Sequence, residues 1–588
     1  MISEIRNLIA ECINDFAKNN GIDFNVVASD IKLEQIRHNI PGDIYTNASI
    51  AYAKRLNIGV VDLSKIMVLA IQKNRYVSDV YVSESGFINI TINADAWRKN
   101  IQNILSLGNM YGSCNLFQGK TANVEFVSAN PTGPLHTGHA RNAVLGSCIA
   151  NLMEKVGYKV TREFYINDMG NQIKLLGKSL YLRYLEACNH DIGSRFSDCM
   201  YHGEYIKKWA SCLVEKYGQS LPIDNQDSED EAERFCAQYA LSASLDEFKS
   251  DLQLLGVMMD IYTSEKEVMS GDKQDEAFKI LKNKGLIYEG ILPKPKSSDA
   301  SEEWEEAQQT LFRSTSYGDD IDRAVKKSNG DWTYFASDIA YHYDKISRGY
   351  DRLVNIFGAD HIGYVKRIKA AVAAMCFDEK PVSIDIIAYQ LVNFLENNVQ
   401  IKMSKRSGVF ITLKDVVEKV GKDITRFTMI SRDSNSVIDF DFAKVVETSL
   451  ENPLFYIQYC HARICSVFRN YEQQYGKLHF DDACTKNCFS YITHKDEIEI
   501  IKILAFYPDL VLSAAIHLEP HRICNYLRDL SKAFHYLWNQ GKINAELRFI
   551  DTSNKEKTLD RMYFLKAIQI VIQNALSILG IDPVFEMK

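Results

Sequence analysis

The alternation of hydrophobic and polar positions divides the first part of the chain into two kinds of unit. Residues 1–110 open with helical spacing and end in paired strands that turn near Ser85 and Gly86, as indicated by VSDVYVSESGFINITI. Residues 121–175 follow the order strand (ANVEFVS), Gly- and Pro-rich loop, helix (about 137–156) and strand (YKVTREFYI). This βαβ order predicts a parallel, doubly wound sheet of the Rossmann type.

Helical spacing dominates the rest of the chain. Residues 176–290 are mostly helical with acidic interruptions, and shorter strands return near 353–358 and 384–392, so we interpret 176–290 as an insertion in a nucleotide-binding domain. From residue 409 onward nearly every segment has helical spacing. The predicted fold is a multidomain α/β protein with a small α+β domain at 1–110, a Rossmann-type domain at 120–408, a helical connector at 409–449 and an all-α domain at 450–588.

Composition and charge exclude several classes of protein. The chain has 588 residues, enough for about three to five domains, and its 46% hydrophobic and 24% charged residues are close to the average of soluble globular proteins. The net charge of −8 argues against indiscriminate binding to nucleic acid. The N-terminus lacks the pattern of a signal peptide, and no stretch approaches the ~18–20 uncharged apolar residues of a membrane span. We therefore expect a soluble, cytoplasmic protein with no membrane partner.

Cysteine usage agrees with a reducing compartment. The thirteen cysteines are odd in number and lie far apart, which favours reduced thiols over a disulfide scaffold. The nearest approach to a metal pattern is Cys484, Cys488 and His494, which lacks a second ligand pair. We therefore expect no metal ion held by a dedicated protein site.

The loop after the first strand of the βαβ unit carries a candidate chemical motif. Its end reads His136, Thr137, Gly138 and His139, at the predicted start of the helix. A helix N-terminus favours polyphosphate, a glycine leaves room for a flat purine ring, and the two histidines can donate to phosphate oxygens. An isolated HTGH would more often be ordinary turn and cap residues. Its position between a strand and a helix of a βαβ unit favours a nucleotide site.

A second candidate motif follows the last predicted strand. It consists of Lys402, Met403, Ser404, Lys405 and Arg406. A basic loop can hold phosphates, and a lysine can follow the negative charge onto pyrophosphate when an α-phosphate is displaced. Taken alone, such a segment is more often a solvated surface loop.

The two motifs together resemble the signatures of class I aminoacyl-tRNA synthetases. The first half is similar to the arginyl-tRNA synthetase family in VEFVSANPTGPLHTGHARNAV and REFYINDMGNQ, and the second half in TYFASDIAYHYDK, FGADHIGY and KMSKRSG, in the same order. The resemblance covers nearly the whole chain, including an N-terminal domain that the family uses on tRNA and a C-terminal helical domain. It implies ATP-dependent ligation of L-arginine to tRNA(Arg) through an arginyl adenylate, with Mg²⁺ accompanying ATP, and we expect a monomer.

The resemblance also assigns roles to single residues. Catalytic contacts to ATP would fall on His136, His139, Lys402 and Lys405, with further ATP contacts from Thr137, Gly138, Met403 and Ser404. The arginine pocket would fall on Glu125, Asn130, Tyr334 and Asp338, with Asp360 or His361 nearby. A guanidinium group is a planar fork of five donors that keeps its charge, so carboxylates and an aromatic ring suit it.

Alternatives remain open from the residues alone. Glu125 could be an edge-strand charge, Asp338 a helix N-cap and Tyr334 a core ring. Tyr456, Tyr459, His461 and Arg463 interleave aromatic rings with cations, which suits RNA contact and a buried helix face equally well. The alternative function is a class I synthetase for another amino acid such as lysine. A dinucleotide-dependent oxidoreductase is disfavoured because the first βα loop lacks GxGxxG, and an inactive RNA-binding paralogue because both motifs are intact.

Lys405→Ala should slow adenylate formation far more than it weakens arginine binding. The ammonium group engages pyrophosphate mainly as negative charge develops, and loss of such a preorganised donor costs on the order of 3 kcal/mol, or about a hundredfold in rate. The measurement is pre-steady-state adenylate formation. A rate within about threefold of the wild-type rate would show that KMSKR is only a surface loop.

Overall fold

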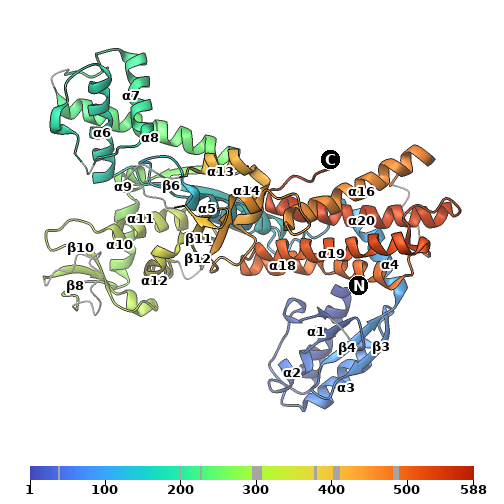
Figure 1. Cartoon of the computed structure of the whole chain (residues 1–588). Coiled ribbons are helices and arrows are strands. Elements are labelled where there is room, and N and C mark those ends of the chain that lie inside the picture. The colour runs from blue at the N-terminus through green and yellow to red at the C-terminus, as the bar shows by residue number, and fades with distance from the viewer. Residues whose placement is uncertain are drawn as a thin grey trace.

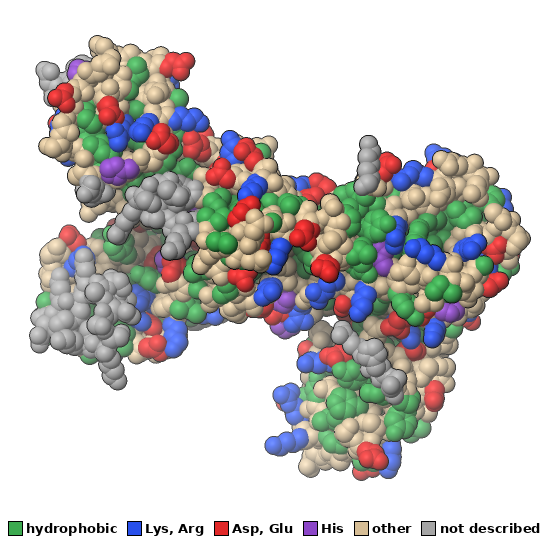
Figure 2. Space-filling model, in the orientation of Figure 1, with side chains coloured by type: hydrophobic (Ala, Val, Ile, Leu, Met, Phe, Trp, Pro, Cys, Tyr) green, Lys and Arg blue, Asp and Glu red, His purple; other side chains and the backbone are tan. Residues whose placement is uncertain are grey.

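The computed structural model describes residues 1–36, 40–197, 200–225, 228–293, 307–376, 380–401, 411–480 and 489–587. A parallel sheet lies at the centre, with a helical insertion at one end and the C-terminal helices at the other (Figure 1). The small N-terminal domain lies beside the C-terminal helices. On the face shown in Figure 2, basic and acidic side chains are interspersed over both of these terminal domains.

The N-terminal domain is the predicted α+β unit. Its sheet is antiparallel in the order β1-β2-β4-β3, and the predicted hairpin is β3 and β4. Ile88, Ile90 and Ile92 of β4 are buried against the helices, as alternation in a half-buried strand requires. The elements are α1 (Ile2–Asn19), β1 (Glu34–Gln35), β2 (Ile44–Thr46), α2 (Ala48–Ala53), α3 (Val60–Ile71), β3 (Val77–Val82), β4 (Ile88–Ile92) and the linking helix α4 (Ala94–Leu107).

The central sheet has five parallel strands in the order β12-β11-β5-β6-β7. Helix α5 (Thr137–Lys155) connects β5 to β6 and is buried along nearly its whole length, so the predicted doubly wound sheet is confirmed. Gly146 of α5 lies on the Phe126 ring, where any larger residue would overlap it. The strands are β5 (Thr121–Glu125), β6 (Lys159–Ile166), β7 (Ile261–Ser264), β11 (Arg352–Gly358) and β12 (Ser383–Tyr389).

The structure divides residues 176–290, which we predicted as one insertion, between two excursions from the central sheet. Three helices after β6 form a hydrophobic cluster of their own, and β7 then returns the chain to the central sheet. A second excursion carries a three-stranded antiparallel sheet. The four residues of β7 are too few to stand out among helical segments, which is why the sequence pattern missed this strand. The elements are α6 (Asn171–Ala187), α7 (Glu204–Tyr217), α8 (Glu229–Leu254), α9 (Glu265–Ser270), α10 (Lys273–Asn283), β8 (Ile287–Gly290), β9 (Gln309–Phe312), β10 (Arg323–Lys326) and α11 (Tyr334–Ser347).

The predicted helical connector at 409–449 also contains a strand. β15 pairs in parallel with β13, and Ile438 and Phe440 of β15 are buried, as period-two alternation in IDFD requires. The connector therefore contributes β15 to a small fourth sheet in the order β14-β13-β15. The elements from α12 onward are α12 (Val365–Met375), β13 (Val392–Glu396), β14 (Val399–Gln400), α13 (Leu413–Val420), α14 (Lys422–Met429), β15 (Ile438–Asp441) and α15 (Phe442–Val445).

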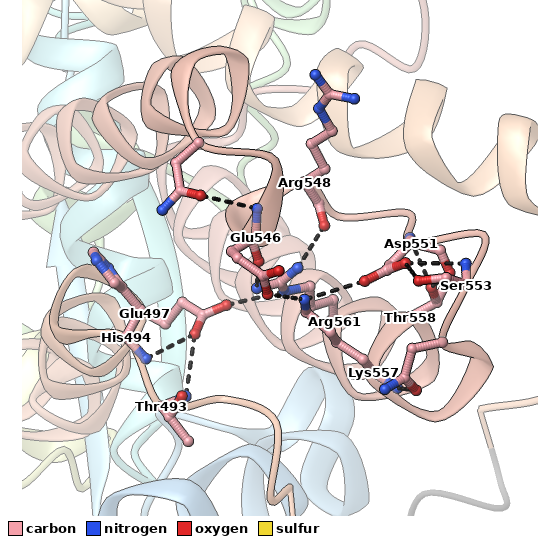
Figure 3. A network of polar contacts seen from close by, with 12 residues as sticks. Thr493, His494, Glu497, Glu546, Arg548, Asp551, Ser553, Lys557, Thr558 and Arg561 are labelled. Atoms are coloured by element: carbon pink, nitrogen blue, oxygen red, sulfur yellow. Dashed lines mark hydrogen bonds and ion pairs between the residues drawn. The ribbon is translucent and has the colours of Figure 1, made fainter.

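The C-terminal domain is helical as predicted, with α16 (Pro453–Tyr475), α17 (Lys495–Ala505), α18 (Tyr507–His517), α19 (His521–Ile543) and α20 (Lys555–Leu579). Two described stretches, Lys495–His517 and Lys555–Leu579, are long and apolar enough to cross a membrane. Length and composition alone are weak evidence for a membrane span. The first is two helices, and 83% of the second's apolar window is buried in the fold. The buried Arg561 of α20 donates to Glu497 and to the backbone carbonyls of Glu546 and Arg548 (Figure 3). The second stretch is thus a core helix of this domain, whereas 39% of the window in the first stretch is buried.

Polar contacts fasten the N-terminal domain to α17 and α18. Arg6 donates two hydrogen bonds of 2.8 Å to Asp509, and the Lys502 ammonium lies 2.7 Å from Asp43. The buried Tyr111 hydroxyl donates to the Leu504 carbonyl at 2.8 Å. The two terminal domains therefore form one continuous body.

The guanidinium of Arg426, on α14, joins three further parts of the molecule. It donates to the carbonyl of Leu579 at the end of α20 at 2.7 Å and to that of Leu255 after α8 at 3.1 Å. It also donates to the Ser147 hydroxyl of α5 at 3.1 Å. Arg426 is fully buried, so these acceptors replace the water that its charge would otherwise require.

Gly580→Ala should destabilise the protein more than Gly318→Ala does. Both glycines have left-handed backbone angles, which cost an L-residue about 1–2 kcal/mol. A Cβ at Gly580 would also overlap the Arg426 guanidinium, whereas nothing lies within 4 Å of one at Gly318. Thermal unfolding midpoints measure the difference, and we expect Gly580→Ala to lose at least about twice as many degrees. Equal losses would show that the Arg426 contact contributes little.

Candidate active site

The HTGH motif lies at the N-terminus of α5, where its two histidines cap the helix. His136 is the N-cap, and its Nδ1 accepts from the Gly138 N–H at 3.1 Å, while Nδ1 of His139 accepts from the His136 N–H at 3.1 Å. The rings stack with centroids 3.8 Å apart. In a neutral ring whose Nδ1 accepts, Nε2 carries the proton, so both histidines present an Nε2–H donor at a helix end that favours anions.

Glycine at position 138 has a local steric reason, in addition to the predicted one of leaving room for a purine ring. A Cβ at this position would lie 2.9 Å from Cε1 of His136, so a larger residue would displace the ring. The glycine therefore preserves the position of the first histidine, whether or not a purine also approaches it.

The structure brings residues 411–413, which follow the second motif in the sequence, next to the first motif. The Leu413 N–H donates to the Leu135 carbonyl at 2.7 Å, and the Thr137 N–H donates to the Ile411 carbonyl at 3.3 Å. Residues 407–410 separate this segment from the KMSKR motif in the sequence. The predicted contacts Lys402, Met403, Ser404 and Lys405 lie outside the described residues.

Glu125 ends the central strand β5, so it is not an edge-strand charge. Its buried carboxylate accepts from the Lys345 ammonium at 2.6 Å and from the Ser128 hydroxyl at 3.0 Å. Strong donors therefore occupy both carboxylate oxygens. The sequence pattern did not indicate the lysine partner.

Helix α11 presents Tyr334 and Asp338 on one face. The N-cap of α11 is Thr333, so Asp338 lies in the second turn and is not a cap. The Tyr334 side chain is 84% exposed, which excludes the alternative of a core ring. Burial, together with the charges of Glu125 and Glu265, raises the pKa of Asp338 to about 7. A carboxyl group with that pKa is poised to receive a cation.

Glu265 is a candidate residue that the sequence analysis missed. It follows β7 directly and is buried near Asp168, and burial and that neighbouring carboxylate raise its pKa. Tyr165 makes a side-chain hydrogen bond to it. A carboxylate just after a parallel strand would have been a strong signal if β7 had been recognised, since ligands bind at that edge of the sheet.

Asn130 and Asp360 are both exposed, unlike the buried carboxylates Glu125 and Glu265. Asn130 is exposed in the loop after β5 and donates to the Gln172 side chain at 3.3 Å. Asp360 follows β11, is exposed, and lies 3.4 Å from His361. The charges that act on Asp338 are those of Glu125, Glu265 and Arg367, whereas Asp360 acts on Tyr389.

In the C-terminal domain, three of the four predicted aromatic and cationic residues share one cluster. The Arg463 guanidinium lies 4.1 Å from the centroid of the Tyr459 ring and donates to His535 at 3.1 Å. The Tyr456 ring lies 4.4 Å from that of His535. His461 is buried and hydrogen-bonds the Val584 carbonyl, so it serves packing.

Within the described residues, no group of three or more His, Cys, Asp and Glu side chains could hold a metal ion. Cys484 and Cys488 lie outside those residues, and His494 is the N-cap of α17.

Comparison with protein families matches three consecutive parts of the chain. Residues 3–92 match the arginyl tRNA synthetase N terminal domain, and residues 100–458 match the catalytic domain of class I (R) tRNA synthetases. Residues 457–587 match the DALR anticodon binding domain.

Full-length relatives and solved structures agree with these matches. The arginine–tRNA ligase of Wolbachia pipientis wMel is 44% identical over 588 residues, covering 100% of both chains. That of Parvibaculum lavamentivorans is 43% identical, covering 97% of this chain and 96% of the relative. The arginyl-tRNA synthetase of Thermus thermophilus shares the fold, with a TM-score of 0.69, 19% identity, and coverage of 99% of this chain and 100% of that one.

Proposed function

Because the chain belongs to the arginyl-tRNA synthetase family, we propose how its residues divide the work of arginine–tRNA ligation. The family membership and activity predicted from the two motifs are confirmed, and the alternative of another amino acid is not favoured. The enzyme uses ATP, L-arginine and tRNA as substrates. The arginine carboxylate attacks the α-phosphate of ATP and pyrophosphate leaves. A ribose hydroxyl of the terminal adenosine of tRNA then attacks the carbonyl carbon of the arginyl adenylate, and AMP leaves.

In the proposed ATP site, the N-terminus of α5 holds the nucleotide. The Nε2–H groups of His136 and His139 donate to phosphate oxygens, and the Thr137 and Gly138 backbone lies at the positive end of the helix dipole. Lys402 and Lys405 complete the site with mobile positive charge, supported by Met403 and Ser404. The pairing of residues 411–413 with residues 135–137 supports this arrangement.

In the proposed arginine site, Asp338 and Glu265 receive the guanidinium group and Tyr334 covers it. The observation that carries this proposal is the carboxylate cluster beyond β5 and β7, where Glu265 and Glu125 raise the pKa of Asp338. A bound guanidinium would supply the missing cation and up to five hydrogen bonds. Glu125 and Asn130 lie on the strand and loop that connect this cluster to the ATP site.

Partners and location complete the proposal. Mg²⁺ enters with ATP as a phosphate-bound ion. The DALR match supports a C-terminal anticodon-binding domain, in which the exposed side of the Arg463 cluster stacks bases. We also propose a monomer in the cytoplasm, with the N-terminal domain contacting tRNA.

Arginine affinity should rise as the pH increases from about 6 to about 8. Asp338, whose pKa is about 7 in the empty site, must lose its proton to face the guanidinium, so each pH unit below that value weakens binding up to about tenfold. Calorimetric titrations in two buffers of different ionisation enthalpy would count the proton released at pH 6. Affinity that is constant from pH 6 to 8, with no proton release, would contradict this assignment.

Asp338→Asn should impair arginine use selectively. The amide keeps the shape but places an N–H against the donors of the guanidinium, so kcat/KM for arginine should fall at least tenfold, by roughly 1.5–3 kcal/mol. The KM for ATP should change little. Asp320→Asn is the matched control, because Asp320 is exposed and pairs with Lys366 at the surface. A wild-type specificity constant in Asp338→Asn would remove this residue from the site.

A further inference from the structure

Three polar side chains form a row across the middle of the central sheet. Asn355 of β11, Glu125 of β5 and Glu163 of β6 are direct neighbours in register, so they project from the same face. All three are buried. Parallel sheets covered on both faces are normally apolar in their interior, and a buried carboxylate is costly unless it is paired. The row therefore needs partners from the helix above it.

Helix α11 supplies those partners from a single face. Its fully buried Lys345 donates to Glu125 at 2.6 Å and to Oδ1 of Asn355 at 3.2 Å. One turn later, Arg348 donates to both oxygens of Glu163 at 2.9 Å. Two cations thus balance two carboxylates beneath the proposed arginine pocket.

A directed chain of hydrogen bonds leads from Lys345 back to the turn that carries Asp338. Nδ2 of Asn355 donates to Nε2 of His342 at 2.9 Å, and Nδ1 of His342 donates to the Asp338 carbonyl at 2.8 Å. This direction requires a neutral His342, and burial together with the Lys345 charge lowers the pKa of His342 to about 4. The ring therefore keeps one tautomer throughout the physiological pH range.

We propose that Lys345 is a positioning residue for the arginine site. Lys345 holds Glu125 as a paired carboxylate and ties Glu125 to the α11 turn that bears Asp338. The inference rests on the proposed arginine site. Lys345 does not touch the ligand: it lies two helical turns below Asp338 on the same face of α11.

The physical effect of Lys345 is to limit the negative charge that Asp338 experiences. Glu125 already raises the pKa of Asp338, and Lys345 is the counter-ion of Glu125. Without that cation, the carboxylate pair would retain its protons to higher pH, whichever of the two carboxylates holds them. Arginine would then have to displace more protons at neutral pH. The other titratable or charged groups facing this pair are Tyr341 and Arg348 of α11, Glu163 and Tyr165 of β6, Glu265 of α9 and Arg367 of α12.

Lys345→Met tests the proposal, with arginine KM and kcat measured from pH 6 to 9 at saturating ATP and tRNA. At pH 7.5, KM for arginine should rise at least about tenfold with a smaller change in kcat. In the plot of 1/KM against pH, the acid limb should move to higher pH by about one unit. Lys345→Arg, which keeps the positive charge, should leave the acid limb at its wild-type pH. A role in stability alone would lower the thermal midpoint and leave KM and the limb at wild-type values, which would overturn the proposal.

A double variant keeps the test decisive if Lys345→Met does not fold. Lys345→Met with Glu125→Gln removes the buried cation and anion together, which proteins often tolerate. Its acid limb should lie at or below that of the wild type, because Glu125 no longer acts on Asp338, and a limb raised by about one pH unit would overturn the proposal. Asp338→Asn distinguishes a failure of the proposed arginine site from a failure of the positioning role of Lys345. If it leaves arginine KM unchanged, the arginine site is wrong. If it raises KM while the Lys345 variants do not move KM or the limb, only the positioning role fails.

Discussion

The burial of helix α5 on all sides is the constraint on which the active site depends. A helix in that position must pair every polar group it carries, and Arg141 does so by donating to the carbonyls of Gln390, Ser436 and Asp433 at 2.6, 2.8 and 3.0 Å. Asn142 accepts from the Val127 N–H and donates to the Ile356 carbonyl. The helix that presents HTGH therefore also fixes the ends of β5 and β11 and the segment beyond β12.

The site has opposite electrostatic character on its two sides. Chain order in the sheet reverses between β5 and β11, and the crevice beyond the strand ends at such a reversal is the usual ligand position in doubly wound folds. On one side, a helix N-terminus and histidine donors suit polyphosphate. On the other, Asp338 and Glu265 suit a cation. A substrate pair with an anionic and a cationic member is thus oriented before any contact is made.

The central βαβ unit and, through the two motifs, the family could be predicted from the sequence because these signals are local. The spacing of glycines, histidines and hydrophobic residues around 121–175 is sufficient for that purpose. Glu265 was missed because β7 is only four residues long, and the partner of Glu125 was missed because Lys345 is 220 residues away. The position of Asp338 within the helix could have been predicted from the sequence, because Thr333 is a good N-cap residue and places the helix start before Asp338. Tertiary pairing of buried charges, by contrast, leaves no periodic trace in a single sequence.

The contact made by Arg426 has a consequence for how the protein tolerates sequence change. Two of its acceptors, at Leu255 and Leu579, are backbone carbonyls, so the guanidinium recognises the path of the chain rather than the side chains along it. Replacing either leucine leaves the acceptor in place. The contact depends on the identity of Arg426 itself, of Gly580, which makes room for it, and of Ser147, whose hydroxyl is a side-chain acceptor. The junction between the catalytic and anticodon-binding parts can therefore diverge in sequence at the two leucines while remaining vulnerable at these three positions.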